Sequence, residues 1–206
     1  MSREGGPARG PARGRRKGTR MFAAIVPPQE VVEDLDAFLE PRREHGFFRW
    51  SPPEQLHVTL AFLDSVSDHA VEDLEEGLAR AAARRSAFPA RVAGGGAFPD
   101  AAHARVLYAG LELTFEARTE LDRLATGARA AAGRAGLSVD GQRFRPHLTV
   151  ARLGHATEAT RWLRILDSYE GPSWTVDRVA LVASYLGEGP RGRPRYETVA
   201  ELPLGG

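Results

Sequence analysis

The sequence predicts an α+β fold with two similar lobes of mainly antiparallel sheet, flanking helices and a cleft shared by the lobes. Helical and strand-like segments alternate, but two pairs of strands follow each other without a helix, which favours antiparallel pairing over a doubly wound parallel sheet. A histidine-containing strand pattern occurs once in each half of the chain, and such a repeat indicates related lobes. With 206 residues, 42% of them hydrophobic, the chain can bury a core.

The first elements follow from apolar spacing and from prolines. The run MFAAIVPP from Met21 is typical of a buried strand that two prolines stop. Residues 29–45 place apolar side chains three and four positions apart, which predicts a helix. We expect a loop over residues 49–55, because adjacent prolines cannot lie inside a helix or strand. The apolar run LHVTLAFL then predicts a strand over residues 56–63.

The middle of the chain predicts a helix followed by a pair of strands. Residues 68–85 place apolar side chains on one helical face, and Asp68 is the expected N-cap. The segments 88–98 and 104–112 are strand-like and flank the loop PDAAH, so we expect them to pair with each other.

The last part predicts two helices and three strands. The Ala- and Leu-rich segment 115–135 is a helix pattern that Gly136 ends. The segment FRPHLTVARL, residues 144–153, is the second histidine-containing strand, and residues 157–169 predict a helix. The two closing strands are rich in β-branched residues and cover residues 174–184 and 194–202.

The composition excludes several classes of protein and site. The chain has no cysteine, so it has no disulfide framework, no thiolate zinc site and no cysteine nucleophile. No apolar run approaches the roughly 20 residues that a membrane helix needs. We therefore expect a cytoplasmic protein that does not enter a membrane, and we expect it to be a monomer.

Residues 1–20 form a basic segment rich in glycine and proline. Seven basic residues against Glu4 give the segment a net charge of +6, so the rest of the chain carries −5. Because the segment cannot bury enough apolar surface to fold alone, we expect a disordered tail; the alternative is a basic arm that holds RNA phosphates. The acidic remainder does not bind nucleic acid by bulk charge, so anion binding there must depend on a few placed arginines.

Two strands carry the same polar pattern, within LHVTLAFLD and RPHLTVARL. Side chains alternate between the faces of a strand, so His57 shares a face with Thr59, and His147 shares a face with Thr149. The intervening apolar residues point into the core. A single motif would suit a histidine packed in the core, but two motifs in the same register indicate two halves of one site.

Paired histidines and threonines favour acid–base catalysis at phosphorus. One neutral imidazole can take a proton from water while the other, protonated, gives a proton to the leaving oxygen, because the ordinary histidine pKa is about 6.5. The hydroxyls can hold the non-bridging phosphoryl oxygens. Zinc prefers three or four ligands, which neither motif supplies, and no Gly-x-Ser-x-Gly elbow is present. We therefore expect no metal and no cofactor.

The two motifs resemble the His-x-Thr-x signature of the two-histidine phosphoesterase superfamily. The similarity is greatest to its RNA 2′,3′-cyclic phosphodiesterases, also called LigT-like proteins or 2′-5′ RNA ligases. It extends over MFAAIVPP, RWSPPEQLHVTLAFLD, FRPHLTVARL and VALVASYLGEGPRGRPRYETVAEL, and so covers nearly everything after the tail, with Tyr196 at the usual aromatic place. The resemblance implies two lobes related by a pseudo-twofold axis with the site between them. Asp64 is a departure, since such proteins commonly carry glycine there.

The resemblance also implies a role for each motif residue. His57 would donate a proton to the leaving oxygen, and His147 would accept a proton from water. Thr59 and Thr149 would bind the phosphate. The product would be a 2′-phosphate, and the reverse step with a 5′-hydroxyl in place of water would be a ligation.

Two arginines beside the second motif are further candidates for substrate binding. Arg145 lies two residues before His147, but the proline between them leaves its direction open. Arg152 lies five residues after His147, and on an unbroken strand this odd offset would direct it away from the catalytic face. The alternative role for Arg152 is a structural ion pair. Three aromatic residues could stack a base or, equally, pack in the core: Phe22, Phe48 and Trp50.

We expect the partner to be RNA with 2′,3′-cyclic phosphate ends. Two other functions stay open. One is a related phosphoesterase that acts on a small cyclic nucleotide, such as an ADP-ribose cyclic phosphate. The other is a non-catalytic protein that binds RNA ends. Turnover of a cyclic-ended oligonucleotide separates an enzyme from a binding protein, and a comparison with cyclic mononucleotides separates the two enzymes.

Overall fold

The computed structural model describes residues 18–46, 48–139, 141 and 143–205. Most of the expected basic tail, residues 1–17, lies outside this range. The described elements, in chain order, are β1 (Thr19–Ile25), α1 (Gln29–Arg43), β2 (Arg49–Trp50), β3 (Val58–Val66), α2 (Asp68–Ala82), β4 (Phe88–Phe98), β5 (Ala104–Glu112), α3 (Phe115–Arg134), β6 (Leu148–Thr157), α4 (Thr160–Asp167), β7 (Glu170–Val176), β8 (Arg178–Tyr185) and β9 (Arg195–Pro203).

The strands form one curled antiparallel sheet in the order β7-β4-β5-β6-β3-β1-β8-β9, with β2 paired to β6. We call β3, β1, β8 and β9 the first lobe, and β6, β5, β4 and β7 the second lobe. The two lobes meet where β3 pairs with β6, at the single residue pair Val58 and Leu148. The expected α+β class with mainly antiparallel lobes is confirmed.

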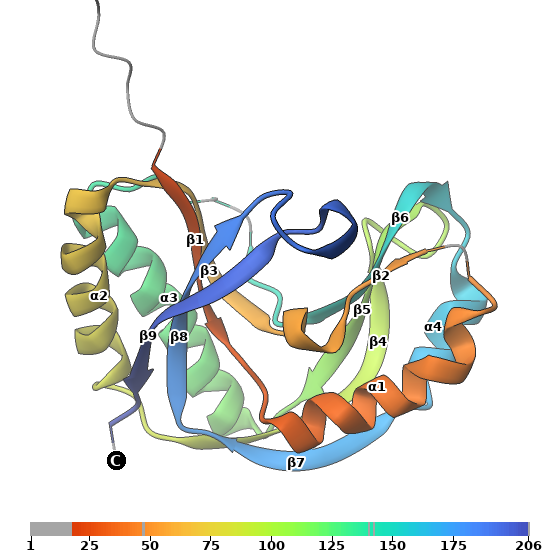
Figure 1. Cartoon of the computed structure of the whole chain (residues 1–206). Coiled ribbons are helices and arrows are strands. Elements are labelled where there is room, and N and C mark those ends of the chain that lie inside the picture. Colours follow the sequence, from red (N-terminus) through yellow and green to blue (C-terminus); the bar gives the residue numbers. More distant parts are fainter. Residues whose placement is uncertain (1–17, 47, 140, 142, 206) are drawn as a thin grey trace, which may run out of the picture.

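Each lobe carries two helices on its outer side (Figure 1). α2 and α3 pack together against the first lobe, through β3, β8 and β9. α1 contacts β7, and α4 contacts β4 and β5, so these two helices cover the second lobe. The chain therefore crosses between lobes repeatedly, since α1 follows a strand of the first lobe but packs on the second.

β1 lies inside the first lobe with both of its faces covered. Met21, Ala23 and Ile25 join the main core, whereas Phe22 and Ala24 join a smaller apolar cluster on the opposite face. Burial on both faces explains why the strand is continuously apolar rather than alternating.

The helix α3 begins and ends as its sequence predicts. The Oγ1 of Thr114 accepts a hydrogen bond of 3.2 Å from the backbone N–H of Ala117, which caps the first turn. Gly136, with φ of +72°, takes the left-handed conformation that commonly follows a helix C-terminus.

Two expected boundaries near the first motif were wrong. The expected loop 49–55 contains the strand β2 and a short 3₁₀ helix over Pro53–Gln55, because its two prolines restrict only their own positions and leave Arg49 free to pair with β6. The N-cap of α2 is Ser67 rather than Asp68, since Ser67 has the extended backbone that precedes a helix and Asp68 is already helical.

Other boundaries differ as well, including those of both motif strands, which begin one residue after their histidines, at Val58 and Leu148. The first strand starts two residues earlier than expected, at Thr19, because it pairs with β3 from that residue onward. The expected strand 174–184 is divided at Asp177 into β7 and β8, which belong to different lobes. The fourth helix is shorter than the expected 157–169, because β6 continues to Thr157 in its pairing with β5.

Replacing Leu121 by alanine should lower the free energy of unfolding by about 2–5 kcal/mol, because this side chain of α3 is fully buried and its removal leaves a cavity. Phe115 lies on the same helix but is 83% exposed, so Phe115→Ala should change the free energy by less than about 0.5 kcal/mol. Urea unfolding of both variants measures the difference. Equal losses would contradict the packing described here.

Candidate active site

The four motif side chains gather around the joint between the lobes. Val58 of β3 pairs with Leu148 of β6 in antiparallel orientation. Continuing the antiparallel register of this pair by one residue on each side sets His57 opposite Thr149 and Thr59 opposite His147, and all four side chains line the same cleft. Directly opposed Cβ atoms in an antiparallel pair are about 4.5–5.5 Å apart. The joint therefore places the two imidazoles and two hydroxyls in one compact group.

Both imidazoles are held by the same backbone contact. The Nδ1 of His57 lies 2.8 Å from the carbonyl oxygen of Gln55, and the Nδ1 of His147 lies 2.7 Å from that of Arg145. A carbonyl oxygen can only accept a hydrogen bond, so Nδ1 carries the proton in each neutral ring. Nε2 is then the nitrogen available to a substrate.

A β-bulge follows each motif. Two consecutive residues of β1 pair with Ala61 and Thr59 of β3. Leu60, which lies between them, is therefore an extra residue of β3. In the same way, two consecutive residues of β5 pair with Ala151 and Thr149 of β6, so Val150 is an extra residue of β6. In both strands two successive residues are therefore buried, and the side-chain alternation shifts by one.

The motif residues line a cleft of about 460 Å³ between the lobes. The lining combines imidazoles, hydroxyls, aromatic rings and guanidinium groups. Its polar and aromatic members include Arg20, Phe22, Arg49, Trp50, Gln55, His57, Thr59, Phe62, His147, Thr149, Arg152, Arg193 and Tyr196. Within the described part of the chain, no aspartate or glutamate lines this cleft.

Aromatic rings pack against both histidines. Phe22 stacks on His57 with ring centres 4.5 Å apart, and Tyr196 meets the same imidazole edge-on at 5.6 Å. Phe98 and Tyr108 meet His147 edge-on at 4.9 and 5.3 Å. These contacts fix the rings and remove them partly from water.

Burial and positive charge lower the pKa of both histidines. Desolvation is the largest cause for His57, whose pKa falls from 6.5 to about 4; the bond to the Gln55 carbonyl opposes this shift, and the charges of His147 and Arg152 add to it. Desolvation also lowers the pKa of His147, with a further lowering from Arg152. Both rings are therefore mainly neutral at pH 7 in the free protein.

The structure brings Arg152 into the cleft, contrary to the expectation from its odd offset. The extra residue Val150 reverses the alternation before Arg152, so the side chain returns to the face of His147. Arg145 behaves differently. Its carbonyl holds His147, but its guanidinium lies 6.0 Å from the ring centre of Phe98 and is not part of the cleft lining.

Of the three aromatic residues that could stack a base, two line the cleft and one does not. Phe22 and Trp50 line the cleft, although both are nearly buried. Phe48 packs between Trp50 and Trp162, with ring centres 5.6 and 5.0 Å away, and does not line the cleft.

Several residues that line the cleft are not predicted from the sequence. Arg20 was assigned to the tail, although it lies two positions before Phe22 and so shares its strand face. Phe62 lies five residues after His57, the position that corresponds to Arg152, and the same bulge turns it into the cleft. The alternation of β1 could have revealed Arg20. No local sequence signal marks Arg193, which follows a 3₁₀ turn before β9.

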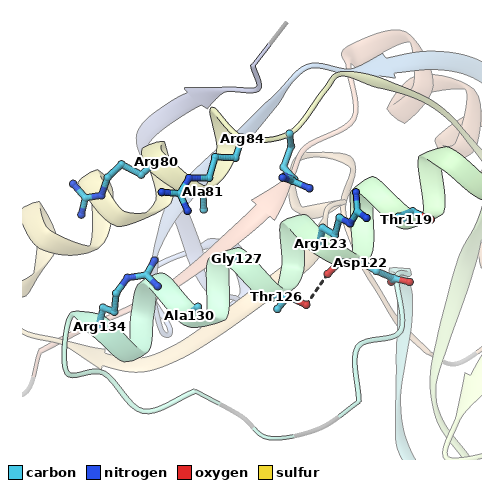
Figure 2. A pocket seen from close by; sticks show the side chains of 11 residues that line it. Arg80, Ala81, Arg84, Thr119, Asp122, Arg123, Thr126, Gly127, Ala130 and Arg134 are labelled. Carbon is cyan, nitrogen blue, oxygen red and sulfur yellow. Dashed lines mark hydrogen bonds between the residues drawn. The ribbon is translucent and has the colours of Figure 1, made fainter.

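A second hollow, of about 850 Å³, lies between α2 and α3, away from both histidines. Figure 2 shows arginines from both helices along it, above a floor of small residues such as Gly127. Three of its arginines have carboxylate partners: Arg80 pairs with Glu76, and Arg85 and Arg123 pair with Glu120. It holds none of the motif side chains, so it is not the candidate active site.

Among the described residues, no group of three or more His, Cys, Asp or Glu side chains lies close enough together to hold a metal ion. None of the helices described combines the length and the apolar content that crossing a bilayer requires.

Comparisons with known proteins agree on one family. A model described as the 2′-5′ RNA ligase superfamily matches residues 27–188. An RNA 2′,3′-cyclic phosphodiesterase of Geobacillus stearothermophilus is 30% identical over 160 residues, which are 77% of this chain and 48% of that protein, so the chain spans about half its length. The RNA 2′,3′-cyclic phosphodiesterase of Thermus thermophilus is 35% identical over 199 residues, covering 91% of each chain. The crystal structure of E. coli LigT complexed with 3′-AMP has a TM-score of 0.69 and 28% identity, and covers 90% of this chain and 98% of that one.

The anchored imidazoles give a prediction for the free protein. Nitrogen-15 NMR at pH 7 should show His57 and His147 as neutral rings protonated at Nδ1, and His57 should titrate at about pH 4. The folded pKa of His57 lies below the ordinary 6.5, so the folded state binds fewer protons than the unfolded state between these values. This contribution to stability is present above pH 6.5 and is lost as the pH falls towards 4. Titration of His57 at or above pH 6.5 would contradict the desolvated site.

Proposed function

The chain belongs to the 2′-5′ RNA ligase superfamily, and we propose that it is an RNA 2′,3′-cyclic phosphodiesterase that opens the cyclic end to a 2′-phosphate. The observation that carries the proposal is the cleft itself. Two imidazoles, each anchored through Nδ1, share it with a threonine beside each, across a single joint of the sheet. Relatives named RNA 2′,3′-cyclic phosphodiesterase support the substrate class.

In the proposed step, water attacks the phosphorus of the cyclic phosphate. Nε2 of His147 accepts the proton of the attacking water, and Nε2 of His57 donates a proton to the 3′ oxygen as its bond to phosphorus breaks. The products are a 2′-phosphate and a 3′-hydroxyl. His147 leaves the step protonated and His57 leaves it neutral, so exchange with solvent restores both rings.

The threonines and Arg152 would bind the phosphate. Thr59 and Thr149 can donate hydrogen bonds to the non-bridging oxygens, where negative charge grows in the transition state. Arg152 lines the cleft with both histidines and its positive charge lowers the pKa of each, which supports a role for its guanidinium in binding the phosphate. The guanidinium of Arg145 has no part in this proposal, because it lies outside the cleft lining.

The acid role of His57 depends on the substrate. In the free cleft its pKa of about 4 leaves the ring almost entirely neutral at pH 7. A bound phosphate adds a negative charge beside the ring and favours the protonated form. The substrate anion thus helps to supply the proton donor. The absence of carboxylates from the described lining supports a mechanism that needs two imidazoles and no metal.

The reverse reaction, in which a 5′-hydroxyl replaces water, would use the same groups and join RNA through a 2′-5′ linkage. A binding protein without turnover would have no use for two anchored nitrogen bases on one phosphate site.

Replacing either histidine should abolish most of the activity. His57→Ala and His147→Ala should each lower kcat by about 10²–10⁴-fold, because each removes a positioned acid or base. Since both act in one transition state, the double variant should be only modestly worse than either single variant. Thr59→Val and Thr149→Val should lower the rate without removing either limb of the pH profile. The assay is hydrolysis of a cyclic-ended oligonucleotide in excess EDTA, with the product phosphate located by NMR.

Near wild-type rates in both histidine variants would refute the proposal, as would activity that disappears with EDTA and returns with zinc or manganese. His69 lies on the surface outside the cleft, so His69→Ala is the matched control and should keep full activity.

The lowered histidine pKa values predict the shape of the pH profile. The profile of kcat/KM reports the free enzyme, so both limbs should lie below pH 6.5, the ordinary histidine value. The profile of kcat reports the bound state, in which the substrate anion raises the pKa of His57. Its optimum should therefore lie at higher pH than that of kcat/KM. Steady-state kinetics between pH 4 and pH 9 measures both, and coincident optima would show that the substrate does not shift the acid.

A further inference from the structure

The cleft holds more positive charge than one cyclic phosphate requires. Its described lining includes four arginines, Arg20, Arg49, Arg152 and Arg193, and no carboxylate. A 2′,3′-cyclic phosphate carries a single negative charge, and Arg152 lies near both histidines where that charge would bind. Three guanidinium groups at the cleft are left without an assigned partner on the substrate.

The fold places two of these charges in direct opposition. Arg49 of β2 is the register partner of Arg152 on β6. Like charges directly across an antiparallel pair destabilise a sheet. No carboxylate of the described residues forms an ion pair with either side chain. Bound anions beside these two side chains would relieve the repulsion.

Gln55, the residue that holds His57, also fixes the segment that carries Arg193. The Nε2 of Gln55 donates a hydrogen bond of 2.8 Å to the carbonyl of Pro194, next to Arg193, while the carbonyl of Gln55 holds His57. The segment that carries Arg193 is therefore fixed to the first motif. Arg193 also has no carboxylate partner within the described chain, although its neighbour Arg195 has two, Glu188 and Glu197.

Arg20 is the fourth arginine of the cleft, and its charge is partly neutralised. It lies over the ring of Phe62, at 4.6 Å from the ring centre, and pairs with the exposed Asp64 at 3.4 Å. The pair is long and solvent-exposed, so it only partly neutralises Arg20.

We propose that Arg49 and Arg193, assisted by Arg20, form a second phosphate subsite that binds the phosphate on the 5′ side of the terminal nucleotide. This inference rests on the proposed function, because it takes the cyclic phosphate to lie at the histidines. In an RNA chain the nearest other phosphate is the one that links the terminal nucleotide to its predecessor. The subsite therefore favours a cyclic-ended oligonucleotide over a cyclic mononucleoside phosphate.

The test compares three substrates with the same terminal nucleoside: the 2′,3′-cyclic phosphate alone, the same molecule with a 5′-phosphate, and a dinucleotide with a cyclic end. Because a charge-assisted contact strengthens binding, kcat/KM should rise about 10-fold or more when the second phosphate is present. Equal gains with the 5′-phosphate and the dinucleotide would assign the effect to the phosphate alone. A larger gain with the dinucleotide would add a contribution from the preceding nucleoside.

Substitution of the subsite should reduce this preference selectively. The double variant Arg49→Gln with Arg193→Gln should bring the ratio of kcat/KM values, with and without the second phosphate, close to one. Arg134→Gln is the matched control: Arg134 is exposed and lies on the hollow between α2 and α3 (Figure 2), so its loss should leave the ratio unchanged. Thermal unfolding checks that all variants fold, and Arg193→Lys, which keeps the charge, should retain part of the preference.

Two results would overturn the inference and leave the proposed function standing: a wild-type protein that hydrolyses all three substrates equally well, or a preference that survives the double substitution. If no substrate is hydrolysed, the proposed function fails. Calorimetric binding of the three compounds to the His147→Ala protein then decides the subsite alone, because recognition of the second phosphate does not need turnover. Equal affinities in that experiment would also reject it.

Discussion

The site depends on one constraint, the pairing of β3 with β6 at Val58 and Leu148. Two four-stranded lobes meet there and nowhere else along the sheet order, so the residues on either side of the joint are the closest polar groups that the two lobes can present to each other. His57 and His147 each lie next to one of these paired residues. Their relative position is set by backbone pairing and by buried side chains, which is a more rigid support than two loops would give.

The two bulges adapt this joint to phosphate chemistry. Without the extra residues Leu60 and Val150, the strands would turn Phe62 and Arg152 away from the histidines; with them, one lobe adds an aromatic ring to the cleft and the other adds a guanidinium. The cost is a cleft with unbalanced positive charge, including opposed arginines on β2 and β6. The cleft concentrates positive charge with no carboxylate in its described lining, which favours the binding of anions.

Much of this arrangement could be predicted from the sequence, because the relevant signals are local. The period-two pattern of His57 and Thr59, repeated ninety residues later at His147 and Thr149, gives both the strands and the polar face. The apolar helix faces and the glycine after α3 give the helices. The direction of Arg152 was not predicted, since a bulge depends on pairing with a distant strand, and two successive apolar residues such as Val150 and Ala151 suit a bulge without requiring one. Arg49 and Arg193 were missed for the same reason: pairing with β6 and a contact with Gln55 bring them to the cleft.

The two lobes hold their imidazoles by the same backbone contact but surround them with different aromatic packing. Each imidazole is anchored by the carbonyl two residues before it, so the tautomer is the same in both. Their surroundings are not equivalent: Phe22 stacks flat on His57, whereas only ring edges meet His147. Stronger desolvation makes His57 the ring that gains more from a neighbouring anion, since the charged form is the one that the empty cleft disfavours. A ring that becomes protonated only when phosphate is bound is suited to donate a proton to the leaving oxygen, and the less perturbed ring is suited to accept one from water. Unequal packing around two equal motifs therefore makes the two imidazoles inequivalent toward protons, as the proposed division into acid and base requires.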